Sequence, residues 1–72
     1  SIRQVAGILA RIKQLKETGQ AVILVSHRMM DVFECCDRVA VLRRGNKIAD
    51  KPIAKTSPEE VTGLITGALE KA

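Results

Sequence analysis

The sequence has few aromatic residues and no long apolar run. Its 72 residues include one Phe and no Trp or Tyr, which leaves few large side chains for a core. The longest uninterrupted apolar run is Ala21–Val25, far short of the roughly 20 residues that a membrane-spanning helix needs. The N-terminus also lacks the charged and then apolar pattern of a signal peptide. We therefore expect a cytoplasmic protein with a small core.

Cysteine is also scarce, because Cys35 and Cys36 are the only two and they are adjacent. Neighbouring cysteines rarely bridge and would close almost no loop, which excludes a disulfide framework. A soft-metal site shared with His27 is the alternative. Metal sites usually need three or four ligands, and adjacent helical residues point about 100° apart. We expect one buried and one partly exposed thiol, and no metal.

The overall composition is that of a globular protein, with 46% apolar and 28% charged residues. The net charge of +4 is spread along the chain and favours acidic partners only weakly. A chain of 72 residues can bury barely enough apolar surface to offset its conformational entropy. We expect it to need a partner surface, further chain segments or self-association.

Three segments show the apolar spacing of helices. The pattern predicts a helix over residues 2–18, which Gly19 ends, and a short helix over residues 29–37. A third helix is predicted over residues 58–70, because Ser57-Pro58-Glu59-Glu60 supplies an N-cap, a first-turn proline and a glutamate at the third position. Gly63 and Gly67 should each weaken this last helix by about 1 kcal/mol relative to alanine.

Two regions have the pattern of strands. Ala21–Val25 is apolar at every position, as in a parallel strand covered on both faces, so residues 21–27 are predicted as a strand and the loop after it. Residues 38–51 predict an antiparallel hairpin with Gly45-Asn46 as its turn. The order helix-strand-helix-strand-strand-helix indicates an α/β fold with a parallel crossover. Its first strand needs neighbours that this sequence does not contain, which suggests part of a larger domain.

Ser26 and His27 directly follow the predicted strand. In open α/β sheets, functional groups gather beyond the carboxyl ends of the strands. A histidine there can donate a ring N–H to a phosphate oxygen or a water. The alternative, which composition alone favours, is a histidine that bonds a backbone carbonyl in the turn. Ser26 is not expected to be a nucleophile, because sequence neighbours on an extended chain point to opposite sides.

Residues 21–45 resemble the switch-histidine segment, or H-loop, of ABC transporter ATPases. The run AVILVSHRMMDVFE, followed by DRVAVLRRG, has the strand, the Ser-His pair, the short acidic helix and the Asp-Arg-Val strand at that family's spacing. The Leu-Lys-Glu-x-Gly turn at residues 15–19 is similar to the helix that follows the family's D-loop. The run TSPEEVTGLITGA at residues 56–68 is similar to the tail of carbohydrate-type members.

The resemblance implies a partial P-loop NTPase-like sheet and makes residues 1–72 the C-terminal fragment of an ATPase domain, from an importer of sugars. It implies that His27 contacts the terminal phosphate of ATP, and that Asp31 and Glu34 are surface or interface positions. The implied partners are the rest of the nucleotide-binding domain, a second ATPase subunit and the transmembrane permease subunits. These would hold the whole protein at the inner face of the membrane.

The sequence lacks the other motifs of that family. It has no G-x-x-x-x-G-K-[ST] phosphate loop, no apolar strand ending in Asp-Glu and no Leu-Ser-Gly-Gly signature. Phosphoryl transfer depends on positioning and on neutralising charge, so one histidine cannot catalyse it without the loop and the carboxylate that holds Mg²⁺. ATP and Mg²⁺ are therefore expected cofactors of the full-length parent only. The isolated chain should be inactive.

A different class of function is a small stand-alone interaction module, in which His27 is structural. Its partner would bind either a helix bearing Met29 and Met30 or the basic hairpin region, whose cations are Arg43, Arg44, Lys47, Lys51 and Lys55. Nucleic acid is not expected as the partner, because Phe33 is the one aromatic residue and lies on an apolar helix face.

Overall fold

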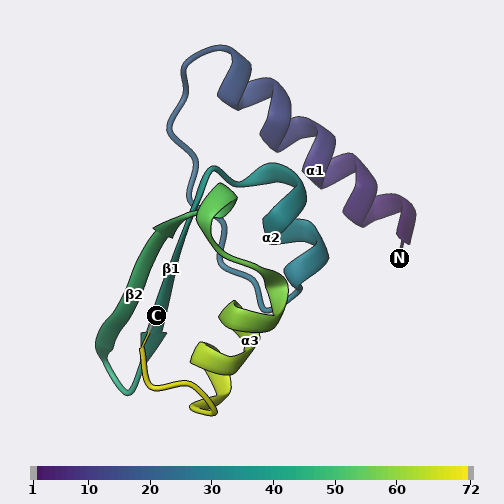
Figure 1. Ribbon diagram of the computed structural model, residues 1–72. Coiled ribbons are helices and arrows are strands. Elements are labelled where there is room, and N and C mark those ends of the chain that lie inside the picture. The colour runs from purple at the N-terminus through teal and green to yellow at the C-terminus, as the bar shows by residue number, and fades with distance from the viewer. Residues whose placement is uncertain (1, 72) are drawn as a thin grey trace.

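The computed structural model describes residues 2–71, and the side chains of residues 4–71. These residues contain three α-helices, one hairpin and one short 3-10 helix: α1 (Ile2–Glu17), α2 (Met29–Cys35), β1 (Arg38–Arg43), β2 (Asn46–Pro52), the 3-10 helix η1 (Ile53–Lys55) and α3 (Pro58–Thr66). Figure 1 shows α2 between α1 and the rest of the molecule, while α3 packs against β1 and α2. The helices α1 and α2 end one and two residues earlier than the sequence predicts.

The predicted hairpin is present and antiparallel, with Arg38 opposite Pro52 and a register irregularity after Val41. Its turn differs from the prediction by one residue. Arg44 and Gly45 have φ values of 53° and 79°, and positive φ at both central residues is what a two-residue type I′ turn requires. Asn46 already pairs with Arg43. The turn pair is therefore Arg44-Gly45, because the twist of the strands selects this turn type.

The core lies between the hairpin and α3. Val41 of β1 packs with Val61 and Leu64 of α3, and these three side chains are buried. Partly buried apolar residues surround them: Met29, Phe33, Val39, Ile48 and Ala49. The two methionines of α2 therefore differ, since Met29 packs on this core and Met30 is exposed.

The start of α3 is as predicted, but its end is not. Ser57 Oγ accepts a hydrogen bond from the Glu60 backbone N–H at 3.1 Å, as an N-cap does. The helix ends at Thr66, four residues before the predicted end, because Gly67 has a φ of 88° and donates its N–H to Gly63 O. Glycine adopts this left-handed conformation without steric cost. Gly67 thus terminates the helix and is not a weak point inside it.

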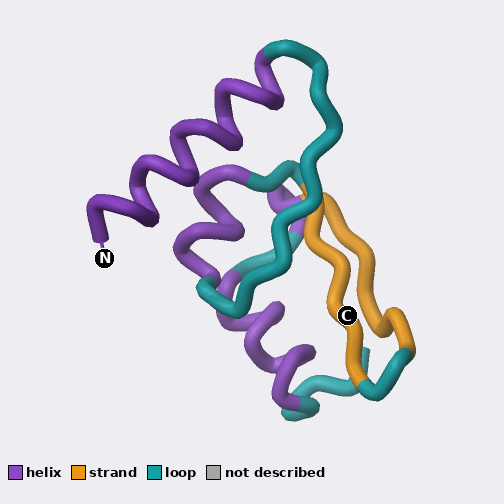
Figure 2. Tube along the Cα trace, turned by 180° about the vertical axis from the view of Figure 1, so that it is seen from behind, coloured by secondary structure: helices purple, strands orange, loops and turns teal. Residues whose placement is uncertain are grey.

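The strand predicted over Ala21–Val25 is absent from the described chain, and so is the parallel crossover that depended on it. Within the described chain, the sheet consists of β1 and β2 alone. Figure 2 shows the connection between α1 and α2 as a loop. A strand requires a neighbour to accept and donate its backbone hydrogen bonds, and residues 2–71 supply none for this segment. An apolar pattern therefore does not make a strand by itself, because it does not supply the segment that the strand must pair with.

Candidate functional site

The segment before His27 is extended although it is not paired. Exposure alternates along it: Val22, Leu24 and Ser26 are half-buried, and Ala21, Ile23 and Val25 are exposed. This period of two is that of an extended backbone with one side against the protein. His27 comes next and is exposed, as the alternation predicts.

The His27 ring is exposed, and no hydrogen bond or ion pair joins it to another residue of the described range. The alternative in which this histidine bonds a backbone carbonyl of the turn is therefore wrong for this structure. Both ring nitrogens remain available to an external group. A neutral imidazole offers one donor and one acceptor, and the protonated ring offers two donors.

The backbone on both sides of His27 is fixed by short-range contacts. Ser26 Oγ accepts a hydrogen bond from the Arg28 N–H at 3.0 Å, which closes a tight turn around the histidine. Arg28 O accepts from Val32 N–H at 3.1 Å and so begins α2. Arg28 Nε also forms an ion pair with Asp31 Oδ2 at 3.2 Å. These contacts hold His27 at the tip of a defined turn.

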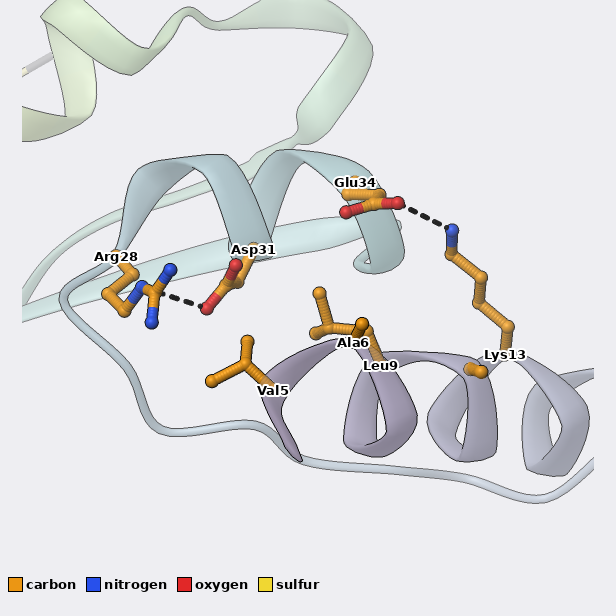
Figure 3. Close-up of a pocket in the computed structure, with 8 residues that line it drawn as sticks. Val5, Ala6, Leu9, Lys13, Arg28, Asp31 and Glu34 are labelled. Atoms are coloured by element: carbon orange, nitrogen blue, oxygen red, sulfur yellow. Dashed lines mark hydrogen bonds and ion pairs between the residues drawn. The ribbon is translucent and has the colours of Figure 1, made fainter. Parts of the chain in front are cut away.

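A groove of about 330 Å³ lies between α1 and α2 (Figure 3). Its lining residues are Val5, Ala6, Leu9, Ala10, Lys13, Arg28, Asp31 and Glu34. The charges along it are matched, since Arg28 pairs with Asp31 and Lys13 Nζ lies 3.0 Å from Glu34 Oε1. The groove therefore offers a small ligand no unbalanced charge. His27 does not line it, so the groove and the histidine are separate features.

Asp31 and Glu34, which the sequence predicted at surface or interface positions, both line this groove. Asp31 is largely covered and pairs within its own helix turn, whereas Glu34 is exposed. The spacing of Arg28 and Asp31 could have indicated their ion pair. Residues 2–71 contain no group of three or more His, Cys, Asp or Glu side chains that could hold a metal ion.

The two cysteines are free, and Cys35 is buried while Cys36 is half-buried, as predicted. Cys35 Sγ donates to Asp31 O at 3.2 Å. Burial raises the pKa of the Cys36 thiol, and the neighbouring Cys35 raises it further. A thiol with a raised pKa is a poor nucleophile at neutral pH.

Sequence reasoning missed Lys16, whose ammonium group donates to Cys35 O and to Asp37 Oδ1 and thereby ties α1 to the end of α2.

Two of the hairpin's cations, Lys47 and Lys51, form ion pairs within the molecule. Asp50 accepts from Arg38 at 3.0 Å and from Lys47 at 3.3 Å, and hydrogen bonding to Arg38 and then Lys47 lowers the pKa of its carboxyl group. Lys51 donates to Glu60 at 2.7 Å. That bond and a second from Thr56 lower the pKa of Glu60. The positive charge of the basic stretch is therefore opposed at Lys47 and Lys51.

Sequence comparison places the chain beside sugar-import proteins. Over 65 residues, 90% of the chain, it is 38% identical to the ribose import ATP-binding protein RbsA of Chromobacterium violaceum. Over the same extent it is 42% identical to the galactose/methyl galactoside import ATP-binding protein MglA of Treponema denticola and 34% identical to that of Escherichia coli. The chain spans about 13% of the length of these relatives. It is homologous to a short segment of sugar-import ATP-binding proteins.

No protein-family model matches the chain, and no solved structure does. None of the helices in the described part of the chain combines the length and the apolar character needed to cross a membrane.

Proposed function

We propose that this chain acts as the C-terminal segment of the nucleotide-binding domain of a sugar-importing ABC transporter, where His27 contacts the terminal phosphate of ATP. The observation that carries the proposal is the identity of 34–42% with sugar-import ATP-binding proteins along 90% of the chain. In this assignment residues 21–25 form a strand of a P-loop NTPase-like sheet. The rest of the domain supplies the neighbouring strands.

The local structure of His27 supports this role. The ring is exposed at the tip of a turn that two flanking contacts fix, one at Ser26 and one at Arg28. A ring N–H can donate to a phosphate oxygen, and a protonated ring also supplies a positive charge. Fixed donors that meet developing negative charge stabilise the transition state of phosphoryl transfer.

His27 supplies one part of such a site. The phosphate loop, the carboxylates for Mg²⁺ and the signature motif would come from the remainder of the ATPase domain and from a second ATPase subunit. Permease subunits would hold the assembly at the inner face of the membrane. The chain by itself should neither bind ATP tightly nor hydrolyse it.

The rival function, a stand-alone interaction module with a basic hairpin, has less support. Arg38, Lys47 and Lys51 already pair with Asp50 and Glu60. An acidic partner would have to compete with these contacts, which leaves less net attraction.

A chimeric protein tests the proposal. Residues 1–72 would replace the matching segment of the Escherichia coli MglA protein, and ATP hydrolysis would be measured with and without His27→Ala. Removing a donor to a transition-state oxyanion lowers turnover by roughly 100- to 1000-fold, and we expect a loss of that order. Gln20→Ala is the matched control, because Gln20 is an exposed polar residue at the start of the same segment. Full turnover of the His27→Ala chimera would refute the assignment.

A further inference from the structure

Residues 21–26 present an unpaired backbone and an apolar outer side. Ile23 and Val25 are 92% and 93% exposed, the highest values among the large apolar side chains in the described range. The backbone of residues 21–27 takes part in no backbone–backbone hydrogen bond that the described structure contains. An extended apolar segment with unpaired N–H and C=O groups is a template for another strand.

The chain exposes more surface than an average folded monomer of its mass. The chain exposes 5549 Å², whereas a folded monomer of 7.8 kDa is expected to expose about 4,400 Å². The excess is about 1,100 Å², and a standard protein interface covers about 800 Å² on each partner. This surplus is a property of the whole surface, to which the exposed side chains of Ile23 and Val25 contribute.

We infer that the partner of this segment in the 72-residue chain is a second copy of the same segment, paired antiparallel about a two-fold axis at Ile23. This register places Ala21 opposite Val25 and Val22 opposite Leu24, so every apolar residue meets an apolar residue. It also places the polar Gln20 opposite the polar Ser26. Cross-strand pairs of this kind are the stabilising unit of a sheet.

The other registers fit less well. Side chains on the same face of the sheet must lie opposite each other. The register can therefore shift only by two residues at a time, which keeps Ala21, Ile23 and Val25 on one face. A shift in one direction puts Gln20 opposite Leu24, and a shift in the other puts Ser26 opposite Val22. Residues 19–27 carry no lysine, arginine or acid, so no like charges oppose the pairing.

Sedimentation velocity of the 72-residue chain over a range of concentrations tests the inference, and its result is independent of the proposed function. We expect a monomer–dimer equilibrium. Ile23→Lys should raise the dissociation constant at least tenfold, because it puts two positive charges opposite each other at the axis. Met30→Lys is the matched control: Met30 is 83% exposed but lies on α2, outside the segment. It should dimerise like the unaltered chain, and far-UV circular dichroism should show all variants folded alike.

A mixture of two variants tests the register. Because residue 23 lies opposite itself, Ile23→Lys mixed with Ile23→Glu should form a heterodimer at concentrations at which each variant alone is monomeric. Three results would overturn the inference: a monomeric unaltered chain, equal weakening by Ile23→Lys and Met30→Lys, or a mixture that associates no better than its components.

Discussion

The folded state should depend on Leu64 far more than on its neighbour Ile65. Leu64 is 0% exposed between the hairpin and α2, whereas Ile65 is 40% exposed on the same helix. Replacing a fully buried leucine by alanine costs about 2–5 kcal/mol, from lost burial and the cavity left behind. We expect about 3 kcal/mol for Leu64→Ala, because the adjacent Met29 has a flexible side chain that can partly refill the space.

Ile65→Ala is the control, since it removes the same number of carbon atoms from the same helix. Its side chain loses less burial, and alanine favours the helix, so the free energy of unfolding should fall by about 1 kcal/mol or less. Urea unfolding followed by circular dichroism would measure both values. A domain of this size is stable by only about 4–11 kcal/mol, so the two variants should be easily separated. Equal destabilisation by both would show that the core between α3 and the hairpin is wrongly placed.

Two further predictions concern the end of α3 and the carboxylates. Gly67→Ala should lower the unfolding free energy by about 1 kcal/mol, because Gly67 has a left-handed φ of 88°. An unchanged urea midpoint would argue against this helix end. Acid should destabilise the fold through Asp50 and Glu60, whose pKa values are lowered by their bonds to Arg38 and Lys51. Their stabilisation is complete above the ordinary values of 3.8 and 4.5 and is lost as the pH falls through the lowered ones. Urea midpoints between about pH 6 and about pH 2 would show the loss, and Glu60→Gln should remove part of it.

Features that depend on neighbouring residues in the chain were predictable from the sequence. The N-cap at Ser57 and the hairpin both follow from local preferences, and the structure contains both. The exposure of His27 at the tip of a turn agrees with its position after an extended segment. The turn pair was displaced by one residue because the sequence does not reveal that Arg44 adopts a positive φ, which is uncommon for arginine.

Features that depend on how elements pack were not predictable. Lys16 contacts Cys35 and Asp37 across 19 and 21 residues of sequence. Its role requires the angle at which α1 lies on α2, and amphipathic spacing fixes only which side of each helix is apolar. The groove between these helices also depends on that angle, so the sequence did not predict it or its matched charges.

The segment Ala21–Val25 shows where local preference and pairing separate. Its residues have the strongest strand pattern in the sequence, and the alternating exposure shows that the extended conformation is present. The hydrogen-bonded ladder is absent, because a ladder is a property of two segments and not of one. The second segment would come from the rest of the ATPase domain in the proposed function, and from a second copy of the chain in the inferred dimer. Because the segment is already extended, pairing with either of these partners would turn it into a strand without a change in its backbone conformation.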